Sequence, residues 1–107
     1  MKGTIKENRD FRYAYRRGDK WVSSYIVLHY VKNRTDSNKI GITVSKLSRA
    51  VDRNRAKRLI RVCWQKYSPL MKQGYNVIVV ARSKMENATL DDVDKAMHYC
   101  LKRLELL

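Results

Sequence analysis

Proline and glycine are scarce in this sequence. One proline and four glycines occur among 107 residues, and there is no low-complexity tract of the kind that forms a linker or a disordered segment. Hydrophobic residues make up 44% of the chain, which is enough to bury a core, while the length leaves room for only one domain. We therefore expect a single folded domain over residues 1–107.

Long apolar runs are also lacking. No run approaches the roughly 20 residues that a membrane-spanning helix needs. The first residues, Met-Lys-Gly-Thr-Ile-Lys-Glu, contain no apolar stretch typical of a secretory signal, and no amphipathic membrane-surface helix is evident. We therefore expect a cytoplasmic protein with no membrane partner.

Cysteine occurs only twice. Cys63 and Cys100 each fall on the apolar stripe of a predicted helix, so we interpret both as buried, reduced thiols. A metal site would need more cysteine or histidine side chains at close spacing. We therefore expect the protein itself to bind no metal and no cofactor.

Acidic residues are few as well. Ten Asp and Glu residues stand against 24 Lys and Arg residues, which gives a formal net charge of +14. A small fold tolerates so much self-repulsion poorly unless a polyanion neutralises it. Nucleic acid is therefore the expected partner.

Hydrophobic periodicity predicts the element order α-β-β-α-β-α. We expect helices at about residues 8–17, 53–67 and from Thr89 onward, and strands at about residues 21–31, 40–45 and 75–81. The first two strands are joined by a short polar loop, so they should pair as a hairpin. The third strand is nearly continuously apolar, which is typical of a strand buried on both faces.

Capping residues mark the ends of the predicted helices. Gly18 is well placed to end the first helix, and Asp52 can cap the second helix, which ends before Pro69. Thr89-Leu90-Asp91-Asp92 resembles a capping box in which Asp replaces the usual Glu. An amphipathic terminal helix should follow it.

The second helix carries a basic face opposite its apolar stripe. Projected at helical spacing, this face spans about 100°. It contains Asn54, Lys57, Arg58 and Arg61, flanked by Arg53 and Arg55. A solvated face usually mixes cations with Glu, but no acid follows Asp52 in this helix. The planar fork of arginine suits phosphate oxygens, so the pattern favours phosphate binding.

Aromatic residues on two elements suggest a second surface. Phe11 and Tyr15 share one helical face, and Tyr25 and His29 share one face of the predicted long strand. Small side chains at Gly41, Thr43 and Ser45 lie on the next strand. Aromatic rings can stack on any base, but packing of Phe11 and Tyr15 in the core is the alternative, and the residues alone favour it.

Three motifs together resemble one known family. The segment Ala50-Val51-Asp52-Arg53-Asn54-Arg55-Ala56-Lys57-Arg58-Leu59-Ile60-Arg61 matches every fixed position of the signature of the bacterial ribonuclease P protein subunit. Gly41-Ile42-Thr43-Val44-Ser45-Lys46 resembles that family's Gly-x-x-Val-Ser-Lys strand end, and Phe11 and Tyr15 resemble its aromatic pair. The similarity spans about residues 6–104.

The resemblance implies an α/β fold and two RNA surfaces. The fold would be a two-layer α+β sandwich with a left-handed βαβ crossover, as in the ribosomal protein S5 domain 2-like fold. Residues implied to contact the catalytic RNA are Lys46, Arg49, Arg53, Asn54, Arg55, Lys57, Arg58 and Arg61. Residues implied to form a cleft for the 5′ leader of precursor tRNA are Phe11, Tyr15, Tyr25, His29, Thr43 and Ser45. With the resemblance, stacking of Phe11 and Tyr15 on leader bases becomes the favoured interpretation.

The implied function is that of a non-catalytic subunit of the ribonuclease P holoenzyme, an endoribonuclease that removes the leader from precursor tRNA. No catalytic residue and no obligate protein partner are then expected, and Mg²⁺ would be bound mainly by the RNA. A self-sufficient nuclease would need clustered carboxylates, and helix capping explains Asp91, Asp92 and Asp94. A ribosomal or other structural RNA-binding protein is the remaining alternative.

The sequence departs from the usual family pattern in two segments. Leu47-Ser48-Arg49, which leads into the signature helix, is shorter than usual and lacks a frequent glycine, so the approach to the helix is expected to differ in shape. The basic tail that often precedes the first helix is nearly missing.

Overall fold

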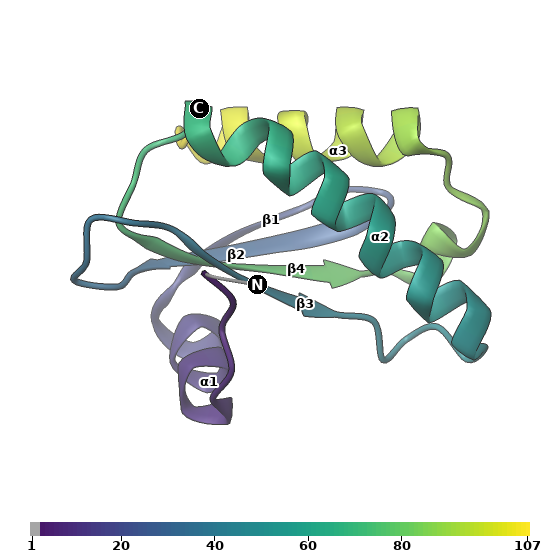
Figure 1. Cartoon of the computed structure of the whole chain (residues 1–107), viewed down its shortest axis with the longest axis horizontal. Coiled ribbons are helices and arrows are strands. Elements are labelled where there is room, and N and C mark those ends of the chain that lie inside the picture. Colours follow the sequence, from purple (N-terminus) through teal and green to yellow (C-terminus); the bar gives the residue numbers. More distant parts are fainter. Residues whose placement is uncertain (1–2) are drawn as a thin grey trace.

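A four-stranded β-sheet forms the centre of the computed structural model, which describes residues 3–107 (Figure 1). The strands are β1 (Asp19–Val22), β2 (Ile26–Lys32), β3 (Lys39–Thr43) and β4 (Tyr75–Ala81), in the spatial order β1-β2-β4-β3. The helices are α1 (Asn8–Arg17), α2 (Ala50–Tyr67) and α3 (Leu90–Arg103), with short 3₁₀ helices at Ser68–Leu70 and Ser83–Asn87. The predicted mixed α/β class is confirmed.

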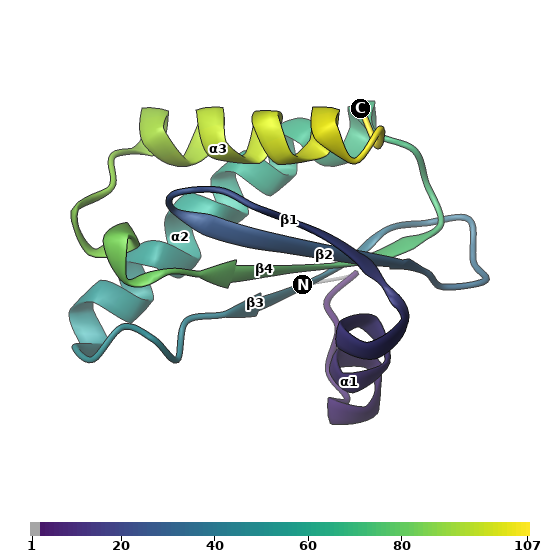
Figure 2. The same cartoon turned by 180° about the vertical axis from the view of Figure 1, so that it is seen from behind.

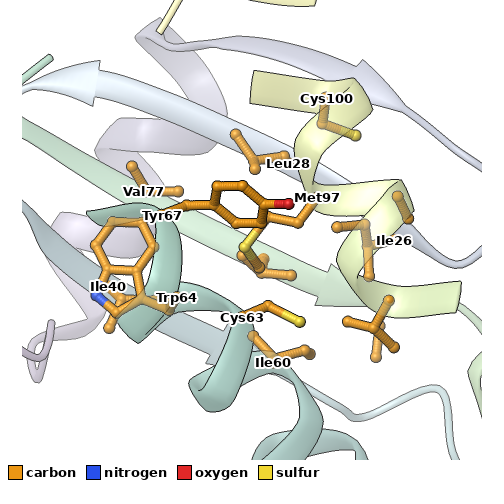
Figure 3. Close-up of a cluster of buried hydrophobic side chains, with 14 of the residues drawn as sticks. Ile26, Leu28, Ile40, Ile60, Cys63, Trp64, Tyr67, Val77, Met97 and Cys100 are labelled. Atoms are coloured by element: carbon orange, nitrogen blue, oxygen red, sulfur yellow. The ribbon is translucent and has the colours of Figure 1, made fainter. Parts of the chain in front are cut away.

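The helices lie on both faces of this sheet. Helices α2 and α3 cover one face, and α1 lies against the opposite face, called the α1 face below (Figures 1 and 2). The main core fills the space under α2 and α3, where Trp64, Tyr67 and Met97 of the helices pack with Leu28, Ile40 and Val77 of the sheet (Figure 3). A smaller cluster under α1 contains Ile5, Ala14 and Ile78.

Local signals place several elements correctly. Helix α1 and strand β4 have the predicted bounds, and α3 begins with the predicted capping box, in which Thr89 and Asp92 each accept a hydrogen bond from the other's backbone. Cys63 and Cys100 are free and buried, as predicted. Gly18 follows α1 with extended backbone angles, and a Cβ there would lie 2.4 Å from the Tyr30 carbonyl oxygen. Close approach of the backbone, rather than a left-handed turn, requires glycine at this position.

The predicted long strand over residues 21–31 is wrong, because the chain turns at residues 23–25, near the start of that range. The Ser23 hydroxyl donates to the Ile26 carbonyl oxygen at 2.8 Å, and the Ser23 amide donates to the same oxygen at 2.9 Å. These bonds close a turn between two antiparallel strands, with Trp21 opposite Leu28. The sheet therefore has one strand more than the predicted order contained.

The predicted hairpin between the strands at 21–31 and 40–45 is also wrong. Strand β4 lies between β2 and β3, antiparallel to β2 and parallel to β3. Val77, Ile78 and Val79 are fully buried. A position inside the sheet removes the most apolar surface of this strand from contact with water. Helix α2 connects β3 to β4, so the crossover expected from the resemblance joins two parallel neighbours.

Helix α2 begins at Ala50, with Arg49 at its N-cap, so the prediction that Asp52 caps it is wrong. Asp52 lies in the first turn, where its carboxylate is 3.7 Å from Arg49 Nε. The earlier start follows from Leu47, which is 3% exposed in the main core and turns the chain through a hydrogen bond from its amide to the Val44 carbonyl oxygen. No helix within residues 3–107 is both long and apolar enough to cross a bilayer.

Candidate nucleic-acid interface

Four of the six predicted cleft residues meet on the α1 face. Phe11 and Tyr15 come from α1, His29 from β2 and Thr43 from β3. The Tyr15 ring lies 4.8 Å from the His29 ring and 6.5 Å from the Phe11 ring, measured between centroids. The hydroxyl oxygens of Tyr15 and Thr43 are 3.3 Å apart, within hydrogen-bond distance. We call these four residues the aromatic group.

Phe11 and Tyr15 differ in how far they are buried. Phe11 is half-buried and packs against the small cluster under α1 and directly over Gly41, where a Cβ would lie 2.7 Å from the ring. Tyr15 is 42% exposed. Phe11 therefore takes part in the core, as the packing alternative expected, whereas Tyr15 presents its ring to solvent.

The surroundings of His29, beside the Tyr15 ring, favour the neutral form of its imidazole. Partial burial lowers the pKa of its imidazole below the ordinary value, and the positive charge of Lys20 lowers it further. A neutral imidazole has one donor and one acceptor nitrogen, so His29 adds a polar edge to the aromatic group without adding charge.

The structure does not bring Tyr25 to the aromatic group. Tyr25 packs against the main core on the other side of the sheet, and Lys84 Nζ lies 5.1 Å above its ring. The turn at Ser23 interrupts the alternation of side chains that the prediction assumed. Ser45, the sixth predicted residue, is exposed in the turn that follows β3.

The predicted basic face of α2 is present, but Arg53 differs from its other cations because it is bound to the protein itself. Asn54, Arg58 and Arg61 are exposed, as are Lys46 and Arg49 in the preceding loop, while Arg55 and Lys57 are partly buried. Arg53 is also partly buried, and its guanidinium donates hydrogen bonds to two loop carbonyls. Asp52, which pairs with Arg49, is the only acid in the helix.

The two predicted RNA surfaces meet at the edge of the sheet. Lys57 and Arg61 of α2 line a hollow of about 500 Å³ together with Phe11 of α1 and Ile42 of β3. This is possible because β3 is an edge strand, which leaves α1 and α2 on either side of one exposed rim. The N-terminal segment covers only the start of that rim, where the Ile5 amide donates to the Ile40 carbonyl oxygen at 2.8 Å.

Sequence reasoning missed a smaller basic hollow at the end of β4. Its volume is about 270 Å³, and it is lined by Ser24, Arg82, Ser83 and Lys84 with no acid among them. Arg82 Nη1 donates to the Ser23 carbonyl oxygen at 2.7 Å, which fixes its guanidinium. The available signal in the sequence was the run Arg82-Ser83-Lys84 directly after β4. Only the turn at Ser23 brings Ser24 beside this run.

The acidic cluster at the start of α3 is engaged in structural contacts. Asp91 pairs with Lys95 at 2.9 Å and Asp94 with Lys66 at 3.1 Å, while Asp92 closes the capping box. Across residues 3–107, His, Cys, Asp and Glu side chains do not gather in threes that could hold a metal ion. These carboxylates do not fit the clustered set that a metal-dependent nuclease needs.

Comparisons with known proteins agree with the motifs. The model of the Ribonuclease P family matches residues 2–105. The ribonuclease P protein component of Clostridioides difficile (strain 630) is 34% identical over 104 residues, covering 95% of this chain and 91% of the relative. The one from Clostridium botulinum (strain Loch Maree / Type A3) is 37% identical over 101 residues, covering 92% and 91%.

Solved structures show the same fold. The RNase P protein of Staphylococcus aureus matches with a TM-score of 0.89 at 29% identity, covering 99% of this chain and 98% of that one. The RNase P protein of Thermotoga maritima matches with a TM-score of 0.83 at 26% identity, covering 94% and 96%. These matches support the ribonuclease P subunit and not the ribosomal or other structural RNA-binding alternative. The chain therefore belongs to the family of ribonuclease P protein components, which are subunits of the tRNA-processing ribonuclease P holoenzyme.

Proposed function

We propose that this protein holds the 5′ leader of precursor tRNA on its α1 face while α2 and the loop before it bind the catalytic RNA of ribonuclease P. The observation that carries this proposal is the exposed Tyr15 ring, set between His29 and Thr43 and continued by a hollow with Lys57 and Arg61 on its rim. Phe11, whose ring lies 6.5 Å from that of Tyr15 and which also lines the hollow, connects the ring for a base with the cations for phosphates.

Stacking suits a ligand whose sequence varies. Every base has a π-face, so a ring binds leaders of different sequence at roughly 1–3 kcal/mol per stacked base. Tyr15 is held by contacts with His29 and Thr43, so its ring is already placed before a base arrives. A fixed ring loses little conformational freedom on binding, which favours affinity.

The α2 surface suits a phosphate backbone. Arg58 and Arg61 are exposed on the same face of the helix, and Lys46 and Arg49 are exposed in the loop before it. Each cation that neutralises a phosphate releases condensed counterions, which makes such binding strong and dependent on salt. The cation-lined hollow at Arg82 and Lys84 offers a further phosphate contact at the end of β4.

The proposed role is binding and orientation rather than hydrolysis. Asp91, Asp92 and Asp94 are engaged with Lys95, Thr89 and Lys66, which favours a structural role for these carboxylates over a role in holding Mg²⁺. We assign cleavage of the phosphodiester to the catalytic RNA and its Mg²⁺, and we place the holoenzyme in the cytoplasm.

A cleavage assay tests this division of roles. Precursor tRNA is incubated with the purified chain, with bacterial catalytic RNA, or with both, at several Mg²⁺ concentrations. We expect no cleavage by the chain alone, and a lower Mg²⁺ requirement for the RNA when the chain is present. Site-specific cleavage by the chain alone would contradict the proposal, and so would a Mg²⁺ requirement that the chain leaves unchanged.

A further inference from the structure

Arg53 differs from the other cations of the basic face, because its side chain is bound to the protein itself. Its Nη1 atom donates to the Leu47 carbonyl oxygen at 3.0 Å and to the Ser48 carbonyl oxygen at 2.7 Å. No other cationic side chain of α2 hydrogen-bonds to a backbone carbonyl within residues 3–107. Two of the hydrogen bonds that Arg53 can make are thus already used within the chain.

The carbonyls that Arg53 binds belong to the short loop between β3 and α2. This loop is anchored from below by Leu47, whose side chain is 3% exposed in the main core. Its other end enters α2 at Arg49, where no side chain caps the helix. Between these points the two hydrogen bonds of Arg53 join the loop to the helix, beside the longer ion pair of 3.7 Å between Arg49 and Asp52. The side chains around these contacts are exposed at Lys46, Ser48 and Arg49.

We propose that Arg53 is a positioning residue that clamps the loop over residues 44–49, so that Lys46 and Arg49 are held ready for the catalytic RNA. The inference rests on the proposed function of the α2 surface and deepens it. A loop that is already ordered loses less conformational entropy on binding than a free one does. Arg53 therefore contributes to RNA affinity through Lys46 and Arg49 more than through its own charge.

The length of the arginine side chain explains why the clamp needs this residue type, because a lysine ammonium also has donors enough for two carbonyls. One guanidinium nitrogen donates to two carbonyls while the charge stays partly exposed. Lysine has the same charge, but its single ammonium sits on a more flexible and shorter stem. Arg53→Lys thus separates the charge of this position from its geometry.

A double-mutant cycle on catalytic-RNA affinity tests the clamp. In the wild-type background, replacing Lys46 and Arg49 together by Ala should weaken affinity on the order of 10-fold. In the Arg53→Ala and Arg53→Lys backgrounds the same replacement should cost less than about 3-fold, because the loop is no longer held. In the Arg58→Ala background, the matched control, it should again cost on the order of 10-fold.

Amide hydrogen exchange in the free protein gives a readout that does not depend on RNA. Exchange at residues 46–49 should be faster in Arg53→Ala and Arg53→Lys, but unchanged in Arg58→Ala. The clamp would be overturned if replacing Lys46 and Arg49 weakened RNA affinity equally in all backgrounds. It would also be overturned if Arg53→Lys kept full affinity for the catalytic RNA. If exchange changes as expected but removal of Lys46, Arg49 or Arg58 leaves RNA affinity intact, the clamp stands and the proposed RNA surface fails. The cycle is run on both Arg53 variants, so loss of folding in Arg53→Ala leaves the Arg53→Lys result decisive.

Discussion

The ring of Tyr15 meets the imidazole of His29 almost at a right angle, with an interplanar angle of 81° and 4.8 Å between the centroids. The contact joins α1 to β2 across a sequence separation that no local pattern reveals. It leaves Tyr15 partly open to solvent while fixing the direction of its ring.

Tyr15→Ala should weaken holoenzyme binding to leader-bearing precursor tRNA by about 1–3 kcal/mol, because one stacked base loses its ring. Affinity for mature tRNA should stay nearly constant. The measurement is equilibrium binding of both tRNAs to the reconstituted holoenzyme. Tyr15→Phe is the matched control, since it keeps the ring and removes only the hydroxyl that lies 3.3 Å from Thr43.

Leader length separates this effect from a general one. Shortening the leader to one nucleotide should remove most of the difference between wild type and Tyr15→Ala, because no strand then reaches the ring. Equal losses for mature and precursor tRNA, in a variant with a normal melting temperature, would contradict a leader-binding cleft.

Phe11→Ala should lower the free energy of unfolding by roughly 1–3 kcal/mol, below the usual range for a fully buried ring because Phe11 is only half-buried. Gly41→Ala should destabilise by a similar amount, about 1–3 kcal/mol, because the added Cβ presses on the Phe11 ring. Denaturant unfolding measures both variants.

The losses in free energy of unfolding should not be additive in the double variant, because the Cβ added by Gly41→Ala no longer contacts a ring once Phe11 is replaced by Ala. Tyr15→Ala serves as the comparison and should unfold almost as the wild type does. A fully additive double variant would show that the contact between Phe11 and Gly41 is not the cause of the loss.

Stability should fall at alkaline pH through Cys63. Burial raises the pKa of its thiol from the ordinary 9.0 to about 11, so the unfolded chain releases this proton at a lower pH than the folded chain. The stabilising contribution is complete below pH 9 and is lost as the pH rises toward 11. The free energy of unfolding from pH 8 to 11, compared with that of Cys63→Ala, isolates this contribution. Parallel pH profiles for the two proteins would contradict it.

Cys63→Ser should lower the free energy of unfolding by about 1–3 kcal/mol, because a hydroxyl without a partner would be buried. Cys100→Ser should also be destabilising, but by less, because the Trp21 carbonyl oxygen that accepts from the Cys100 thiol at 4.0 Å lies beside the new hydroxyl. RNA affinity of the folded variants should barely change. Thiol labelling of the native protein should be much slower than in denaturant, since both thiols are at most 2% exposed. Labelling at equal rates would show that the thiols are accessible.

Arg58→Ala and Arg61→Ala should each weaken catalytic-RNA binding and reduce the salt slope by about one, because each removes one phosphate contact. Both side chains are exposed on α2, so folding should be unaffected. Affinity titrations at several salt concentrations provide the measurement. Arg55→Ala, a partly buried cation on the same helix, tests whether the effect belongs to the exposed face.

Much of this protein is determined by its local sequence. The bounds of α1 and β4, the capping box of Thr89 and Asp92 and the burial of both cysteines follow from periodicity and capping chemistry, which act over a few residues. The charge and the arginine-rich helix likewise point to nucleic acid, and the motifs to the ribonuclease P family, without any tertiary information.

Strand order was decided by tertiary structure alone. The polar loop after β2 is consistent with a hairpin to β3, but β4 takes the place between them. A strand that is apolar on both faces gains most by lying at the centre of the sheet, and that gain outweighs the cost of the longer connection through α2.

The environment of single side chains was also decided by the tertiary structure. Alternation along a strand predicted that Tyr25 and His29 share a face, but it holds only while the strand continues, and the turn at Ser23 ends it. A helical projection placed Arg53 beside the basic face. Such a projection gives the direction of each side chain around the helix axis, but not the atoms that the side chain contacts. Only the folded chain brings the carbonyls of Leu47 and Ser48 to that guanidinium, because burial of Leu47 folds the loop back over the first turn of α2.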